Sequence, residues 1–193
     1  MEKMSNGGSG IKAAWIVVDL VNDFVSGRFG SERSVQVAER TGDLIRRLEG
    51  AIPVVFTMDT HIDNDPEFMV WGEHCLQGTE ASELHRSISQ YRGQRIRKRH
   101  FDSFFESDLD GYLRATGAEN LFISGISTDI CVQHTAAGAY FRYYGINIIS
   151  DLCSSITESS HETALDFMRK NYGARIIKAE EFEKEILKWQ MQK

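Results

Sequence analysis

The 193-residue sequence lacks long hydrophobic runs, has few cysteines and carries no excess of positive charge. Its longest uncharged apolar run covers residues 13–18, whereas a helix that crosses a bilayer needs about 20 such residues. We therefore expect no membrane segment and no membrane partner. Acidic residues outnumber basic ones 28 to 22, which gives a formal charge of −6. This balance disfavours attraction to phosphate backbones, so we expect no nucleic-acid partner.

The three cysteines, Cys75, Cys131 and Cys153, are an odd and sparse set for a disulfide framework. A reducing compartment is the simpler assumption, and it predicts a cytoplasmic protein. Each cysteine is then a packed core residue, a ligand or a nucleophile.

The composition is that of an ordinary folded domain, with 41% hydrophobic and 26% charged residues. Residues 1–10 are polar and rich in glycine and serine, which predicts a flexible N-terminal tail. The remaining residues, 11–193, fit the length of one domain.

Short apolar or β-branched runs alternate with segments of helical spacing along this domain. The predicted strands cover residues 14–19, 52–59, 94–99, 120–125, 146–151 and 174–178. The predicted helices cover residues 34–49, 107–116, 130–144, 158–172 and 179–189. Four glycines follow helical stretches and are expected to cap them, namely Gly50, Gly117, Gly145 and Gly173. The alternation predicts an α/β fold: a single-domain three-layer αβα structure with a mostly parallel, six-stranded, Rossmann-like sheet.

The third predicted strand differs from the others in charge. Its alternation places Arg95, Arg97 and Arg99 on one face. A central parallel strand is covered on both faces and would not tolerate this row, so we expect a sheet edge. The basic cluster is better interpreted as a solvated edge than as an anion site. Lys98, on the opposite face, needs a separate explanation.

Polar side chains stand at the carboxyl ends of four predicted strands, where open α/β sheets bind ligands. Asp19 and Asp59 end the first two strands, Lys98 lies near the end of the third, and Cys131 follows the fourth through residues 125–129. Cys131 would open the next helix, whose N-terminus favours a thiolate. Its position alone would suit a packed core cysteine. The expected convergence with Asp19 and Lys98 favours a nucleophile instead.

Residues 60–91 form a long irregular insertion, which is usually functional in a compact domain. Asp59, His61 and His74 offer a carboxylate and two imidazoles, a set that suits zinc or a similar divalent ion. The same spacing also occurs by chance. A further ligand, direct or through water, is available from Asp63, Asp65, Glu67 and Glu73.

Three ordered motifs resemble those of a known family. Residues 17–24 (VVDLVNDF) resemble the opening motif of the isochorismatase-like cysteine hydrolases, and residues 98–104 (KRHFDSF) resemble their lysine motif. Residues 125–132 (GISTDICV), with residues 135–136, resemble their nucleophile motif. The resemblance extends over residues 14–178.

This resemblance implies an amidohydrolase with Asp19, Lys98 and Cys131 as its catalytic residues. It also implies an oxyanion hole made by the backbone N–H groups of Ser127 and Cys131, beside a cis peptide bond between Ile126 and Ser127.

Within the family, the insertion is similar to that of nicotinamidases and pyrazinamidases. The similarity implies a metal held by Asp59, His61 and His74, most simply Zn²⁺ with iron or manganese as alternatives. It also implies that Phe24 and Trp71 wall a substrate ring, although either could be a core residue. Three positions depart from the nicotinamidase pattern, namely Val21, Thr60 and Gly138.

The sequence therefore predicts an enzyme that releases ammonia from a small carboxamide, with nicotinamide converted to nicotinate through a thioester on Cys131. The alternatives are a hydrolase of N-carbamoylsarcosine-type or other small amides, and a non-catalytic member of the family. Because the family commonly self-associates, the resemblance also implies a homo-oligomer.

Overall fold

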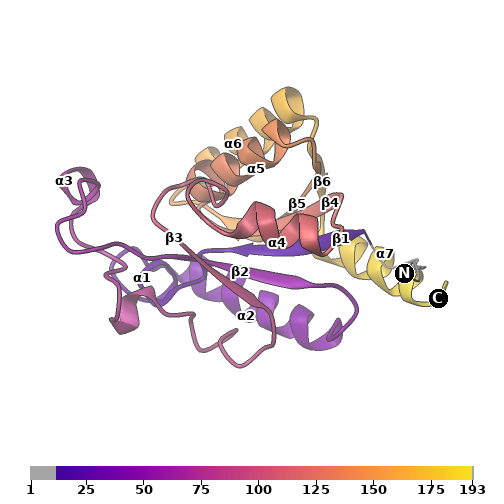
Figure 1. Cartoon of the computed structure of the whole chain (residues 1–193), viewed down its shortest axis with the longest axis horizontal. Helices are drawn as coiled ribbons and strands as arrows, with labels where there is room; N and C mark the ends of the chain where they lie inside the picture. Colours follow the sequence, from indigo (N-terminus) through magenta and orange to yellow (C-terminus); the bar gives the residue numbers. More distant parts are fainter. Residues whose placement is uncertain (1–11, 193) are drawn as a thin grey trace, which may run out of the picture.

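Six strands form one parallel sheet at the centre of the computed structural model, which describes residues 12–192 (Figure 1). The strands are β1 (Ala13–Val18), β2 (Val54–Asp59), β3 (Gln94–Lys98), β4 (Asn120–Ile126), β5 (Gly145–Ser154) and β6 (Arg175–Ile177). Their order is β3-β2-β1-β4-β5-β6, and every neighbouring pair is parallel. The predicted αβα fold is confirmed, with an all-parallel rather than a mostly parallel sheet.

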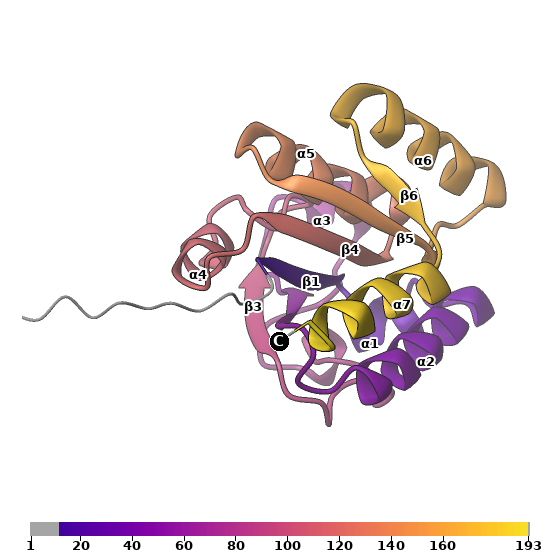
Figure 2. The same ribbon diagram turned by 90° about the vertical axis from the view of Figure 1, so that its right-hand side faces the viewer.

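Helices cover both faces of the sheet (Figure 2). The longer helices are α2 (Glu32–Arg47), α4 (Leu109–Ala115), α5 (Gln133–Phe141), α6 (Glu158–Tyr172) and α7 (Ala179–Gln190). One apolar core joins the sheet to α2 and α7, and a second joins its other face to α4, α5 and α6.

The central strand β1 shows why the two cores form. Its residues alternate between the faces, so that Trp15 packs in the first core and Ile16 in the second, and both are fully buried. The Trp15 indole N–H donates to Ser124 Oγ at 2.9 Å, which satisfies the one polar atom of that side chain.

The edge position of the third strand is confirmed, because β3 pairs only with β2 among the strands of the described chain. Arg95 and Arg97 are exposed, and Arg97 pairs with Glu83 at 2.8 Å. The opposite face carries the buried Ile96 and Lys98.

Three local features differ from the sequence prediction. The segment predicted as one helix over residues 130–144 begins with a π-helical turn (Thr128–Val132), and α5 follows it. The short helices α1 (Asn22–Val25) and α3 (Phe68–Trp71) were not predicted. Gly145 does not cap a helix but begins β5, and Tyr143 adopts the positive φ of 64° instead. A Cβ at Gly145 would lie 2.1 Å from Asn120 Oδ1, so close packing explains the glycine.

The predicted flexible tail, residues 1–10, lies outside the described residues. Within residues 12–192, no helix is both long enough and apolar enough to span a bilayer.

Candidate active site

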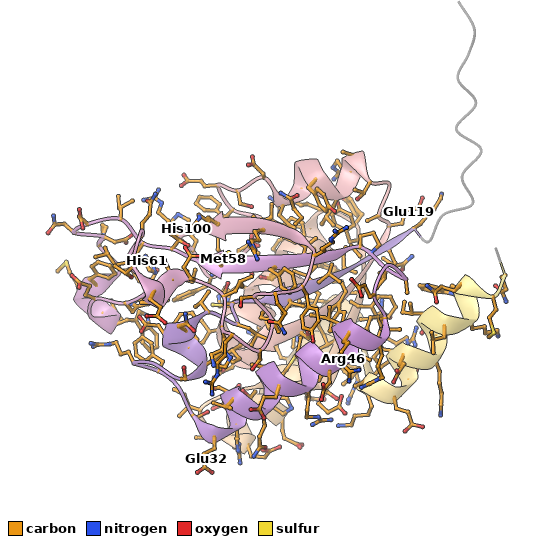
Figure 3. All side chains as sticks on the ribbon, turned by 90° about the horizontal axis from the view of Figure 1, so that it is seen from below. Glu32, Arg46, Met58, His61, His100 and Glu119 are labelled. Atoms are coloured by element: carbon orange, nitrogen blue, oxygen red, sulfur yellow. The ribbon has the colours of Figure 1, made fainter. Side chains whose placement is uncertain are left out.

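The candidate site lies where the strand order reverses, between β1 and β4, at the carboxyl end of the sheet. Strand β1 has β2 on one side and β4 on the other, and crevices at such switch points bind ligands in open α/β sheets. Figure 3 shows His61 and His100 at this end, and Glu119, which precedes β4, at the opposite one.

Asp19 follows β1 directly and is completely buried. Its backbone has a positive φ of 51°, an uncommon conformation for a residue other than glycine. Thr57 donates its hydroxyl proton to Asp19 Oδ1 at 2.9 Å. Gly125 of β4 passes so close that a Cβ there would lie 2.0 Å from the carbonyl oxygen of Val18, and its φ is 123°. Only glycine allows this approach of β4 to the end of β1.

Lys98 reaches this site from the inner face of the edge strand. Its Nζ lies 2.6 Å from Asp19 Oδ2, 3.0 Å from Asp59 Oδ1 and 3.9 Å from Cys131 Sγ. Burial alone would lower the pKa of the ammonium group, but the two carboxylates raise it well above its usual value. Lys98 is therefore a fixed positive charge between the thiol and two acids.

Cys131 belongs to the π-helical turn that follows β4, and 5% of its surface is exposed. Burial raises the pKa of its thiol well above the usual value, although Lys98 acts in the opposite direction. The expected thiolate at a helix N-terminus is thus outweighed by desolvation, and the thiol needs a base. Burial also raises the pKa of Asp19 despite the opposing charge of Lys98, so this carboxylate binds a proton more readily than an exposed aspartate.

The turn between β4 and Cys131 is held by its own backbone. The Ile126–Ser127 peptide bond is cis, as the family resemblance implies. The carbonyl oxygen of Ser127 accepts hydrogen bonds from the N–H groups of Ile130 and Val132, both at 3.1 Å. The Ser127 hydroxyl donates to Asp129 Oδ1 at 2.6 Å.

Asp59, His61 and His74 are brought together as predicted, with one ligand atom from each within 4.8 Å of the others. All three residues are buried. The Nδ1 atom of each imidazole is hydrogen-bonded to a group outside this set. His61 Nδ1 lies 3.1 Å from Asp65, and His74 Nδ1 lies 2.7 Å from the Gly72 carbonyl oxygen. Their Nε2 atoms converge on Asp59 Oδ2, at 3.0 Å and 3.6 Å.

This donor set fits a divalent metal. Metal-binding histidines typically hold their second nitrogen on a carboxylate or carbonyl, as His61 and His74 do here. Of the four further acids that the sequence offers, Asp65 lies behind His61, and Glu67 Oε1 lies 4.0 Å from His74 Nε2. Asp63 and Glu73 are exposed. Glu67 therefore has the best access to an ion held by the three ligands.

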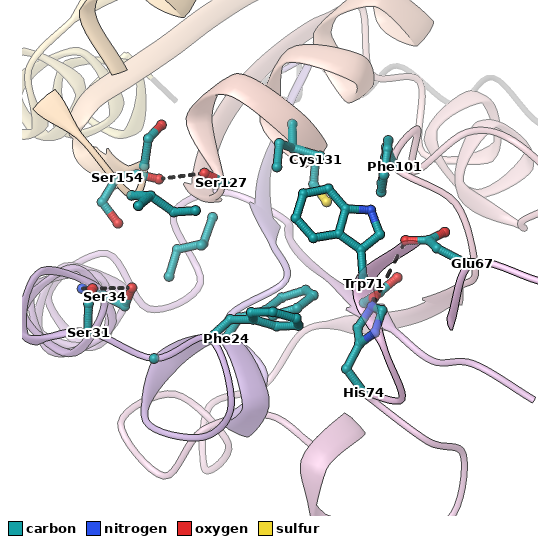
Figure 4. Close-up of a pocket in the computed structure, with 17 residues that line it drawn as sticks. Phe24, Ser31, Ser34, Glu67, Trp71, His74, Phe101, Ser127, Cys131 and Ser154 are labelled. Atoms are coloured by element: carbon teal, nitrogen blue, oxygen red, sulfur yellow. Dashed lines mark hydrogen bonds and ion pairs between the residues drawn. The ribbon is translucent and has the colours of Figure 1, made fainter. Parts of the chain in front are cut away.

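A cavity of about 200 Å³ is lined by Cys131 and by two of the three proposed ligands, Asp59 and His74. Figure 4 shows Cys131, Phe24, Trp71, His74 and Glu67 around this cavity, and the ring centroids of Phe24 and His74 are 5.9 Å apart. Phe29 and Phe101 also line the cavity and were not identified from the sequence. Phe29 follows the opening motif by five residues and Phe101 lies within the lysine motif, but aromatic residues so placed are equally common in cores.

The fold and the site together define an α/β protein of the αβα class with a buried thiol, carboxylate and ammonium group at its switch point. The chain belongs to the isochorismatase family, because the model of the isochorismatase domain matches residues 13–181.

Solved structures agree with this assignment. The chain is similar to N-carbamoylsarcosine amidase from Thermoplasma acidophilum, with 31% identity, a TM-score of 0.80 and coverage of 88% of this chain and 97% of the other. It is similar to nicotinamidase from Bacillus subtilis, with 30% identity, a TM-score of 0.81 and coverage of 87% and 100%. The pyrazinamidase of Pyrococcus horikoshii in complex with zinc has 27% identity, a TM-score of 0.79 and coverage of 86% and 99%.

Proposed function

We propose that this protein is a cysteine amidohydrolase that releases ammonia from a small carboxamide and that its substrate is nicotinamide. The observation that carries the proposal is the buried contact of Lys98 Nζ with Asp19 at 2.6 Å and with Cys131 Sγ at 3.9 Å, beside an aromatic cavity. The similarity to a nicotinamidase and to an N-carbamoylsarcosine amidase supports amide hydrolysis as the reaction class.

In the proposed reaction, Cys131 Sγ attacks the carboxamide carbon while its proton passes to Asp19. Asp19 returns this proton to the amide nitrogen, the C–N bond breaks, and ammonia leaves a thioester on Cys131. Water then attacks the thioester carbon while Asp19 takes a proton from it. The C–S bond breaks as Asp19 returns this proton to Cys131 Sγ, which gives the acid and restores the thiol. Lys98 keeps one positive charge beside the thiol and the carboxylate during both steps.

The oxyanion of each tetrahedral intermediate needs preorganised donors. We assign this role to the backbone N–H groups of Ser127 and Cys131. The turn that carries them follows β4 and lines the cavity.

We assign the metal ligands to Asp59, His61 and His74, with Glu67 as the nearest further acid. Zinc is the proposed metal, and iron and manganese suit the same nitrogen and oxygen donors. When bound, the metal supplies a Lewis acid that can hold a ring nitrogen of the substrate. Phe24 and Trp71 provide the apolar walls on which a planar ring can pack.

The experiment that tests the substrate measures ammonia release from nicotinamide and from N-carbamoylsarcosine under identical conditions. We expect nicotinamide to have the larger kcat/KM, because four aromatic side chains line the cavity: Phe24, Phe29, Trp71 and Phe101. Preference for N-carbamoylsarcosine would replace the proposed substrate with the second candidate. Absence of turnover with a panel of small amides, and of Cys131 alkylation, would favour a non-catalytic member.

Removal of a metal ligand is expected to impair substrate binding more than thiol reactivity. His61→Ala should lose most of the bound metal and raise KM for nicotinamide by tenfold or more. Loss of a residue that merely orients a metal ligand typically costs about 10- to 100-fold in affinity or activity, and loss of a ligand should cost at least as much. The measurements are elemental analysis, KM and the rate of Cys131 alkylation, which should stay within about threefold of wild type.

The matched control is His100→Ala, because His100 pairs with Glu106 at 3.3 Å rather than with Asp59. This variant should keep its metal. A wild-type protein that contains no metal after purification without chelators, or an unchanged KM in His61→Ala, would contradict the proposed metal role.

We also propose a cytoplasmic, self-associating protein. Three buried free thiols suit a reducing compartment. The exposed aromatic residues Tyr140, Phe141 and Tyr143 offer a surface that self-association could cover. Light scattering after size-exclusion chromatography would give the oligomeric state.

A further inference from the structure

A hydrogen bond between Thr128 and His161 joins the turn that carries Cys131 to helix α6. Thr128 Oγ1 lies 2.8 Å from His161 Nδ1. Thr128 comes directly after Ser127 and three residues before Cys131, and none of its surface is exposed. His161 lies in the first turn of α6, whose start is fixed by Thr157, since the Thr157 hydroxyl accepts the N–H of Ser160 at 3.1 Å.

Besides this contact, the Ser127 hydroxyl lies 3.5 Å from the Ser154 carbonyl oxygen of β5, a longer hydrogen bond between the turn and another element. The bonds from Ile130 and Val132 to the Ser127 carbonyl, and from the Ser127 hydroxyl to Asp129, lie within the turn and fix its shape. The bond between Thr128 and His161, at 2.8 Å, is the shorter of these two links, and it joins the turn to a helix residue 33 positions later in the sequence.

The burial of Thr128 makes this bond hard to replace. When a buried hydroxyl loses its partner, the folded state is destabilised because no water can take the partner's place. An exposed hydroxyl would form a hydrogen bond with water instead. Burial also lowers the pKa of His161, so the ring is neutral near pH 7 and keeps one nitrogen as an acceptor. The neutral ring can therefore accept the hydroxyl proton of Thr128 at Nδ1.

We propose that His161 is a positioning residue that acts through the Thr128 hydroxyl to hold Cys131 Sγ and the backbone N–H groups of the turn in their reactive places. The inference rests on the proposed amidohydrolase function. His161 does not line the cavity, and it acts on the reaction only through the turn.

Loss of the bond should lower kcat more than it raises KM. The groups assigned to ring binding, Phe24, Trp71 and the metal ligands, come from other elements and stay in place. A displacement of reacting groups by about 1 Å can cost about 100-fold in rate. We therefore expect kcat to fall by about 10- to 100-fold, with KM within threefold of wild type.

The test compares Thr128→Val, His161→Ala, His161→Asn and the double variant Thr128→Val/His161→Ala, with nicotinamide as substrate. Thr128→Val removes the hydroxyl but keeps the shape of the buried side chain. It therefore still tests the hydrogen bond if His161→Ala folds poorly. His161→Asn retains a polar group near the place of Nδ1 and should recover at least a third of the wild-type kcat.

The double variant should be no slower than the slower single variant, because both changes remove the same interaction. His100→Ala is the histidine control and should retain wild-type kcat.

The proposal is overturned if Thr128→Val retains wild-type kcat, if the effects of the two single variants multiply, or if His161→Asn is as slow as His161→Ala. Failure of the proposed function is a separate outcome, seen as no turnover of any small amide by the wild-type protein. In that case the deciding measurement is Cys131 alkylation by iodoacetamide. Loosening of the turn should speed alkylation at least threefold in Thr128→Val, and an unchanged rate overturns the positioning role.

Discussion

Replacement of Cys131 by alanine is expected to lower amide hydrolysis by a factor on the order of 10⁵ to 10⁶, as for other enzymes that lose an activated nucleophile. Sγ is the atom that forms the proposed thioester and lies 3.9 Å from Lys98 Nζ, and alanine has no nucleophilic atom to replace it. The fold should persist, because alanine is smaller than cysteine and suits a helical turn. The measurements are ammonia release from nicotinamide and the thermal unfolding midpoint.

The matched control is Cys153→Ala. Cys153 is also a buried free cysteine, it lies in the neighbouring strand β5, and burial raises the pKa of its thiol to about 12. It does not line the cavity, so its removal should leave kcat within about threefold of wild type. Activity of Cys131→Ala within tenfold of wild type would eliminate the thioester mechanism.

Replacement of Asp19 by asparagine is expected to lower kcat by about 10²- to 10⁴-fold, the usual contribution of a general acid–base group. The amide keeps the shape of the carboxyl group and can still accept the Thr57 hydroxyl proton at Oδ1. It cannot take the proton of the Cys131 thiol or return it to ammonia. Steady-state kinetics with nicotinamide measure the loss, and KM should change little because Asp19 does not line the cavity.

The thiol itself should remain chemically competent in Asp19→Asn. The negative charge of Asp19 raises the pKa of Cys131, while Lys98 lowers it. With the aspartate charge gone, the Cys131 pKa should fall, and alkylation at alkaline pH should be at least as fast as in wild type. A kcat within tenfold of wild type would show that Asp19 is not the base. Loss of both kcat and alkylation would indicate damage to the site rather than loss of proton transfer.

The family motifs and the polar residues at strand ends were sufficient to find most of the candidate site. Asp19, Lys98 and Cys131 converge as expected because parallel strands present their carboxyl ends at one edge. Arg95 and Arg97 predicted the edge position of β3, because a strand covered on both faces would bury their charged side chains.

Other features depend on contacts that no local pattern records. The two imidazoles of the metal set owe their orientation to Asp65 and to the Gly72 carbonyl. His161 gave no signal of a partner, because Thr128 lies 33 residues earlier in the chain. The expected thiolate of Cys131 was wrong for the resting structure, since burial depends on all the elements that surround the turn.

The sequence by itself determined the order along the chain of the six strands and the five longer helices, the edge strand and the residue types that gather at one end of the sheet. These follow from side-chain periodicity and strand direction, which are local properties of the chain. The tertiary structure alone decided the 2.6 Å contact of Asp19 with Lys98, the aromatic walls added by Phe29 and Phe101, and the bond between Thr128 and His161. These features arise where segments distant in sequence pack together, and their distances and burial are set by the whole fold rather than by any one segment.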